Sequence, residues 1–212
     1  MTTRQKLGKI MLVTGLLTGA LLPVAPARAG TLPATGQTTA YPANKNDGIP
    51  GAVNVPDDGT LQRGASLNYK VLNDGTLKDV NTGLIWEVKC RICAVPGLHS
   101  VNNVYRWSGN GSQETIWDWL EDINAEGGTG YAGHNDWRIP NVRELQSIVD
   151  YGAFNPSIDP VFIFTAATDY WSSSTTDGGP LIAWDVHFGN GAVVSNAKSN
   201  AFHVRAVRGG PK

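Results

Sequence analysis

The stretch GHNDWRIPNVRELQS occupies residues 133–147 and contains a well-marked helix start. Pro140 precedes Asn141, which is a preferred N-cap residue, and Glu144 follows three positions later, the spacing of a capping box. Apolar side chains then recur at helical spacing, at Val142, Leu145, Ile148 and Val149. We therefore predict a helix that begins at residue 142 and buries this apolar face.

The turn before this helix contains two polar residues of possible catalytic type, His134 and Asp136. Polar residues in a Gly-rich turn usually bond the nearby backbone, as Asn and Asp commonly do. We interpret both as turn residues and not as an acid–base pair.

Residues 112–126 predict a second amphipathic helix. Its apolar positions follow one face, at Ile116, Trp119, Leu120 and Ile123. The acidic side chains lie off that face, at Glu114, Asp118, Glu121 and Asp122. Gly127 and Gly128 then end the helix.

The remaining pattern is typical of short strands. Residues 69–72 and 76–80 flank an Asn-Asp-Gly turn and predict a hairpin, and residues 82–88 form a mostly apolar strand. Further strands are expected at residues 170–174, 182–188, 192–195 and 202–207. Residues 69–210 are thus expected to form an α+β domain: two helices packed on small antiparallel sheets with long irregular loops.

Asp185 and His187 share the polar face of one expected strand. No Ser or Cys nucleophile stands near them in a nucleophile-elbow context. We expect a solvated face there, no catalytic residues, and no enzymatic activity.

The N-terminus has the organisation of a secretory signal. Residues 1–9 are basic, residues 10–24 are largely apolar, and Ala27-Arg28-Ala29 forms an A-x-A cleavage site. We predict a signal peptide at residues 1–29, a disordered leader at residues 30–68, and export to the periplasm, the medium or the cell surface. No transmembrane segment is expected after cleavage.

The net charge of the chain after the signal peptide argues against some classes of binding partner. The chain has 17 basic and 18 acidic residues, and residues 1–29 contain four basic residues and no acid. The segment after the signal therefore has 13 basic and 18 acidic residues, a net charge of −5. Such a protein has no general attraction to nucleic acid or anionic membranes.

Cys90 and Cys93 are the two cysteines of the chain. In an oxidising compartment a disulfide between them is the favoured interpretation. Redox-active thiols remain one alternative. A metal site is the other, with His99 as third ligand and no obvious fourth. No metal or other cofactor is expected.

Several ordered motifs resemble the Lcl C-terminal domain family. They are the stretch NDGT followed by NTGLIW at residues 73–86, the stretch at residues 133–147, and YWSSS, AW, FGNG and VRAVRGG between residues 170 and 210. The resemblance implies a C-type-lectin-like fold. It also implies kinship with a collagen-like bacterial adhesin whose C-terminal domain binds sulfated glycans. This chain has no Gly-X-Y repeat, and its acidic charge does not favour sulfated ligands.

We accordingly expect an exported binding module of the cell envelope that recognises a glycan or another surface component. The alternative is a structural or assembly component of a surface complex without glycan binding. If ligand binds, irregular loops should form the site, at residues 95–111, 175–180 and 189–195. The expected contact residues combine aromatic faces with amides: Tyr105, Trp107, Asn102, Asn103 and Asn110. Trp107 has an alternative interpretation as a plug that closes its loop onto the core.

Overall fold

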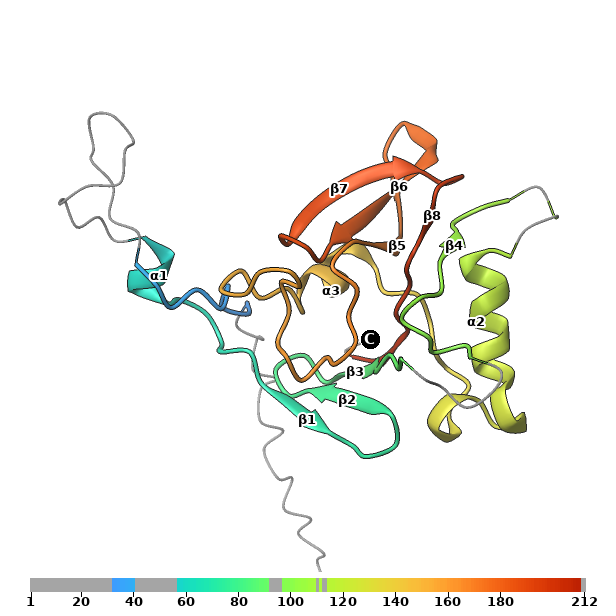
Figure 1. The fold of residues 1–212 in the computed structure, drawn as a ribbon, viewed down its shortest axis with the longest axis horizontal. Helices are drawn as coiled ribbons and strands as arrows, with labels where there is room; N and C mark the ends of the chain where they lie inside the picture. Colours follow the sequence, from blue (N-terminus) through green and yellow to red (C-terminus); the bar gives the residue numbers. More distant parts are fainter. Residues whose placement is uncertain (1–31, 41–56, 92–96, 110, 112–113, 211–212) are drawn as a thin grey trace, which may run out of the picture.

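A computed structural model describes residues 32–40, 57–91, 97–109, 111 and 114–210. Three small antiparallel sheets dominate this part of the chain. Figure 1 shows two of them at opposite ends of the domain, with helix α2 (Ile116–Ala125) along one side. None of the described helices has the length and hydropathy that a bilayer span requires. The predicted signal peptide lies outside the described residues.

The first sheet has the strand order β1-β2-β3-β9. Its strands are β1 (Tyr69–Val71), β2 (Thr76–Asp79), β3 (Leu84–Glu87) and β9 (Val207–Gly209). The expected hairpin is confirmed, because Tyr69 pairs with Asp79 and Val71 with Leu77. Gly75 in its turn has a φ of 88°, and a β-carbon there would lie 2.4 Å from the Tyr131 hydroxyl. Glycine is therefore required at this position both for its conformation and for its size.

The second and third sheets contain the remaining strands of the described residues. The second pairs β4 (Tyr105–Arg106) with β8 (Ala201–Phe202), and the third has the order β5-β6-β7. The strands of the third sheet are β5 (Asp169–Thr176), β6 (Gly179–His187) and β7 (Ala192–Ala197). The single strand expected at residues 202–207 is divided, because the chain leaves β8 and joins β3 only at β9.

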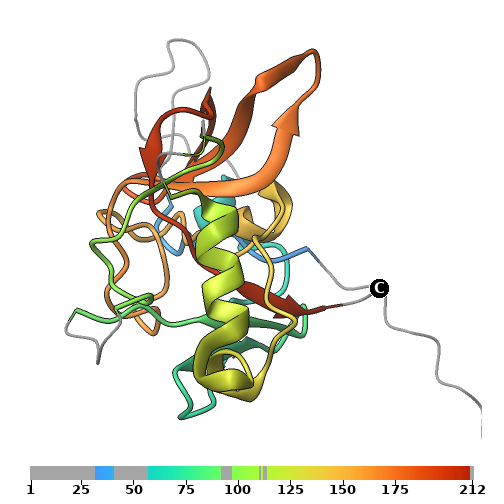
Figure 2. The ribbon, with the colours of Figure 1, turned by 90° about the vertical axis from the view of Figure 1, so that its right-hand side faces the viewer.

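Two apolar cores lie between these elements. One joins the first sheet to helix α3 (Val142–Gln146) and β6, around Trp86, Leu145 and Phe188. The other lies between α2, the second sheet and β5, around Trp119, Trp137 and Trp171. In Figure 2 helix α2 faces the viewer and runs between the third sheet above it and the first sheet below it.

The expected fold class is wrong. Small antiparallel sheets make up most of the regular structure of the described residues, the described helices are few and short, and a C-type-lectin-like fold is not confirmed, although α2 and α3 do pack against the sheets. Helix α3 has five residues, because Ser147 Oγ donates to the Glu144 carbonyl and Val149 forms an isolated bridge with Ile158. Ile148 and Val149 are therefore buried although they lie after the end of the helix, Ile148 in a turn and Val149 in a β-bridge. The described part of the chain also contains helix α1 (Asp58–Leu61) and the 3-10 turns η1 (Glu126–Gly128) and η2 (Tyr131–Gly133).

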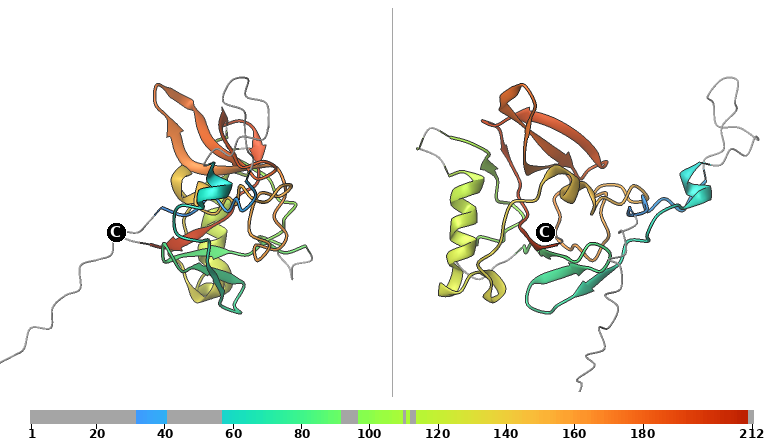
Figure 3. Two further views of the ribbon diagram at one scale, coloured as in Figure 1. Left: turned by 90° about the vertical axis from the view of Figure 1, so that its left-hand side faces the viewer. Right: turned by 180° about the vertical axis from the view of Figure 1, so that it is seen from behind.

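Part of the segment expected to be a leader is described and contacts the domain. The Tyr151 amide donates to the Thr35 carbonyl at 2.7 Å, and Pro33 forms a parallel bridge with Ala65. Figure 3 shows this segment and α1 at the edge of the body, on the side away from α2.

The capping box at α3 is present as the sequence predicts. Asn141 Oδ1 accepts from the amides of Arg143 and Glu144, both at 2.9 Å, and Glu144 Oε2 accepts from the Asn141 amide. Asn141→Ala is expected to lower the free energy of unfolding by about 1 kcal/mol, because two helix-end amides lose their acceptor. Urea unfolding of this variant beside Arg143→Ala, an exposed control, measures the loss. Equal stability of the two variants would contradict it.

Candidate functional site

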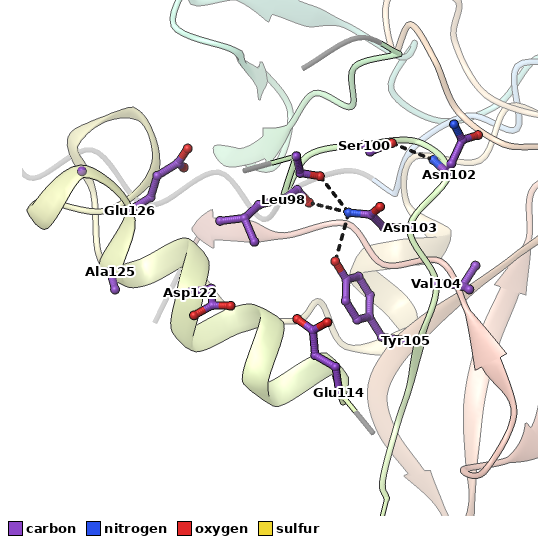
Figure 4. A pocket seen from close by; sticks show the side chains of 12 residues that line it. Leu98, Ser100, Asn102, Asn103, Val104, Tyr105, Glu114, Asp122, Ala125 and Glu126 are labelled. Atoms are coloured by element: carbon purple, nitrogen blue, oxygen red, sulfur yellow. Dashed lines mark hydrogen bonds between the residues drawn. The ribbon is translucent and has the colours of Figure 1, made fainter. Parts of the chain in front are cut away.

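An open groove lies between the loop at residues 97–105 and the acidic face of α2 (Figure 4). Its volume is about 950 Å³. Amide, phenol and carboxylate groups line it, together with small and apolar residues: Gly97, Leu98, Ser100, Asn102, Asn103, Val104, Tyr105, Glu114, Asp122, Ala125, Glu126 and Gly127.

The loop wall is organised by the side chain of Asn103. Its Nδ2 donates to the Gly97 carbonyl at 2.8 Å and to the Tyr105 hydroxyl at 3.0 Å. Figure 4 shows this amide between Leu98 and Tyr105. Tyr105 is 6% exposed and belongs to the core, so only its edge faces the groove, whereas Asn102 is exposed.

The helix wall follows from the amphipathic pattern of α2. The buried face, with Ile116, Trp119 and Ile123, fixes the helix on the core. A capping box between Thr115 and Asp118 fixes its start. The opposite face is thereby presented to the groove and to solvent.

The groove is acidic, because Glu114, Asp122 and Glu126 all line it. Partial shielding from water raises the pKa of Glu114, and the nearby Asp122 and Asp118 raise it further. Burial raises the pKa of Tyr105, and Glu114 adds to the effect. Such surroundings favour ligand groups that donate hydrogen bonds or carry positive charge.

A buried ionic network lies behind the groove. Glu87 is 0% exposed, and its Oε1 lies 2.8 Å from both Lys89 Nζ and His99 Nδ1. His99 Nε2 lies 3.0 Å from Glu126 Oε2. Burial alone would raise the pKa of Glu87, but Lys89 and His99 lower it to about 2. Glu87 is therefore a buried carboxylate held ionised by its partners.

Three of the five predicted contact residues come together in the groove: Asn102, Asn103 and Tyr105. Asn110 lies outside the described residues. Trp107 does not line the groove. Its indole N–H donates to the Ser172 carbonyl at 2.9 Å, and Lys198 Nζ lies 3.6 Å from its ring centroid. These contacts favour the plug interpretation of Trp107.

Asp136 and Asp185, which the sequence predicts in a turn and on a solvated strand face, both have hydrogen-bond partners in the structure. Asp136 accepts from Arg208 Nε at 2.7 Å and so forms an ion pair with a residue distant in sequence. Asp185, expected on a solvated face, is 0% exposed. Its Oδ2 accepts from Asn196, and burial raises its pKa to about 6 despite that bond. β6 is the central strand of its sheet, and the face that bears Asp185 is covered.

The structure describes His99 and Cys90, two of the three residues of the metal alternative. Both ring nitrogens of His99 face carboxylates, which leaves neither of them for a metal ion. Among the described residues no group of three or more metal-binding side chains is present. Cys93 lies outside those residues, so the Cys90–Cys93 disulfide stays a prediction.

Sequence reasoning missed the helix wall of the groove. It placed the site in loops alone, whereas Glu114, Asp122 and Glu126 come from α2 and its two ends. The signal was available in the acidic face of the predicted helix. Nothing in the local pattern indicated that this face would lie opposite Asn102 and Asn103.

Comparisons with known protein sequences bear on the family of the chain. No curated protein matches the chain. The family model of the Lcl C-terminal domain matches residues 75–208, which is well over half of the 212 residues and contains the whole groove. This chain therefore belongs to the Lcl C-terminal domain family.

Proposed function

We propose that this protein is an exported, non-catalytic binding module of the cell envelope, and that the groove beside α2 receives a saccharide. The observation that carries the proposal is the juxtaposition of Asn102 and Asn103 with Asp122 and Glu126 across an open groove. Amides and carboxylates are suited to the closely spaced hydroxyl groups of a sugar, since they accept and donate hydrogen bonds in fixed directions.

The charge of the groove selects among saccharides. No Lys or Arg is among the described residues that line it, whereas three carboxylates are. A sulfate or carboxylate on the ligand would meet these like charges, which cost free energy in a partly desolvated site. The ligand class is therefore a neutral or amino-bearing saccharide.

Export rests on the signal-type pattern of residues 1–29, which lie outside the described part of the chain. The acidic charge of the remaining chain agrees with a protein that does not bind nucleic acid. The site of action is accordingly the periplasm, the medium or the cell surface.

An array of immobilised saccharides tests the ligand class. It holds three sets, which are neutral, amino-bearing and sulfated, and is probed with the purified full chain at several salt concentrations. We expect retention on the neutral or amino-bearing sets. Retention confined to the sulfated set, or none at all, would contradict the proposal.

A substitution in the helix wall tests the groove. Asp122→Ala is expected to weaken saccharide binding about tenfold to a hundredfold, because a hydrogen bond to a charged group contributes about 1.5–3 kcal/mol. Glu121→Ala is the matched control, since Glu121 is an exposed neighbour on the same helix that does not line the groove. Calorimetric titration measures the saccharide affinity of both variants. Equal affinities would contradict the assignment of the groove as the saccharide site.

One observation favours a second candidate function, a structural or assembly component. Phe154 is 80% exposed and Leu181 is 76% exposed, so each offers an apolar side chain that a partner protein would cover. If Phe154→Ser abolishes incorporation into a surface complex while Asp122→Ala does not, assembly is the principal role.

A further inference from the structure

His99 lies between two carboxylates from distant parts of the chain. Its Nδ1 is 2.8 Å from Glu87 Oε1 on β3, and its Nε2 is 3.0 Å from Glu126 Oε2 at the end of α2. Its side chain is 12% exposed. The ring stacks on Tyr131 with a centroid distance of 3.9 Å, which holds it in the plane that reaches both acids.

The protonation state of the His99 ring decides whether both of these contacts can be hydrogen bonds. A neutral imidazole has one N–H, and its second nitrogen is an acceptor. In that form one of the two nitrogens would direct its lone pair at a carboxylate oxygen. Both contacts are hydrogen bonds only when His99 is an imidazolium that donates from both nitrogens.

Five charged or titratable groups of the described residues surround the ring. Glu87 and Glu126 are its partners, Lys89 bonds to Glu87, Tyr131 stacks on the ring, and Arg205 donates to the Glu87 carbonyl. Burial and Lys89 disfavour the imidazolium, but the bonds to Glu87 and Glu126 raise the pKa of His99 above its ordinary value. The two acids outweigh burial and Lys89, because each of them is hydrogen-bonded to a ring nitrogen.

His99 also lies at the base of the groove loop. Its carbonyl accepts from the Cys90 amide at 3.0 Å, and the adjacent Leu98 carbonyl accepts from Trp119 Nε1 at 3.0 Å. Asn103 donates to the Gly97 carbonyl, so the wall with Asn102 and Tyr105 is connected to the His99 segment. Glu126 itself lines the groove. The bond between His99 and Glu126 therefore connects the loop wall of the groove to its helix wall.

We infer that protonated His99 is a latch that joins the two walls of the groove, and that its deprotonation loosens the loop and weakens ligand binding. This inference concerns the regulation of the proposed saccharide site and rests on that function. A loop held in its binding conformation loses less entropy when the ligand binds, so the latched form has the higher affinity.

The pH dependence of the stabilisation by His99 follows from the difference between its pKa in the folded and in the unfolded protein. The unfolded side chain titrates near pH ~6.5. In the folded protein the pKa lies higher, so the stabilisation is fully present below about pH 6.5 and is lost as the pH rises through the folded pKa. Ligand affinity should fall in the same window, by about threefold to tenfold, since the loosened loop must be ordered again when ligand binds.

NMR titration of the full chain tests the latch without any ligand. The imidazole resonances of His99 report its protonation, and the indole N–H resonance of Trp119 reports its bond to Leu98. We expect both to change together as the pH rises above about 6.5, and His99→Gln to remove the change at Trp119. Glu126→Gln keeps the buried bond to Glu87 and should lower the midpoint of the titration. His134→Gln, an exposed histidine, is the control.

The outcomes separate the latch from the proposed function. The latch is overturned if the pKa of His99 is at or below that of an unperturbed histidine. It is also overturned if the Trp119 resonance does not change while His99 titrates, even if saccharide binds. Saccharide affinity that is unchanged across the His99 transition overturns its regulatory role. If no saccharide binds at any pH, the proposed function fails, and the resonances of His99 and Trp119 still decide the latch.

Discussion

Replacing Glu87 by alanine is expected to lower the free energy of unfolding by about 3–5 kcal/mol. Glu87 is 0% exposed and accepts from Lys89 Nζ, from His99 Nδ1 and, through Oε2, from the Ala206 amide. Its removal leaves the ammonium of Lys89, itself buried, without a counter-charge. An uncompensated buried charge is among the most destabilising changes that a single substitution can make.

Urea unfolding at a pH below about 6.5, where His99 is protonated, measures this loss. Glu121→Ala on the exposed face of α2 removes a carboxylate from the surface and serves as the control. In the double variant Glu87→Met with Lys89→Met the buried ammonium is removed together with its counter-charge, and His99 keeps Glu126, so a large part of the stability should return. A loss of under about 1 kcal/mol for Glu87→Ala would contradict the proposed network.

Trp107→Ala is expected to lower the free energy of unfolding by about 3 kcal/mol and to leave saccharide affinity unchanged. Its indole N–H bonds to the Ser172 carbonyl, its ring meets Trp117 edge-on at 5.0 Å, and Lys198 Nζ lies over its face. Substitution removes these contacts and leaves the Ser172 carbonyl without this donor.

Thermal and urea unfolding, combined with calorimetric titration of a bound saccharide, distinguish a plug from a ligand anchor. Trp107→Phe keeps most of the ring volume but loses the indole donor, so its loss should be smaller. An unchanged melting temperature together with lost binding would show that Trp107 contacts ligand.

The local features of the fold could be predicted from the sequence. The capping box at Asn141 and the hairpin around Gly75 depend on residues a few positions apart, and both are present. The strand that contains Trp86 was recognised by its apolar run. The apolar spacing after Leu145 was misleading, because Ile148 and Val149 can be buried by a turn and a bridge as well as by a helix.

The site could be predicted only on one side. Asn102, Asn103 and Tyr105 stand out as polar and aromatic residues in an irregular loop, and they line the groove. The His99 network joins residues 12 and 27 positions apart in sequence, and no periodic pattern indicates such a contact. Asp185 was misjudged for a similar reason: alternation along a strand does not show which elements cover its polar face.

Chemical-shift mapping of a saccharide titration tests the central claim most directly. Full-length protein labelled with ¹⁵N is titrated with a neutral or amino-bearing saccharide retained on the array, at a pH below about 6.5. The account predicts that the largest shifts fall on the side-chain amides of Asn102 and Asn103 and on the backbone amides around Asp122 and Glu126. Shifts concentrated at residues 175–180 and 189–195, with the groove unchanged, would contradict it.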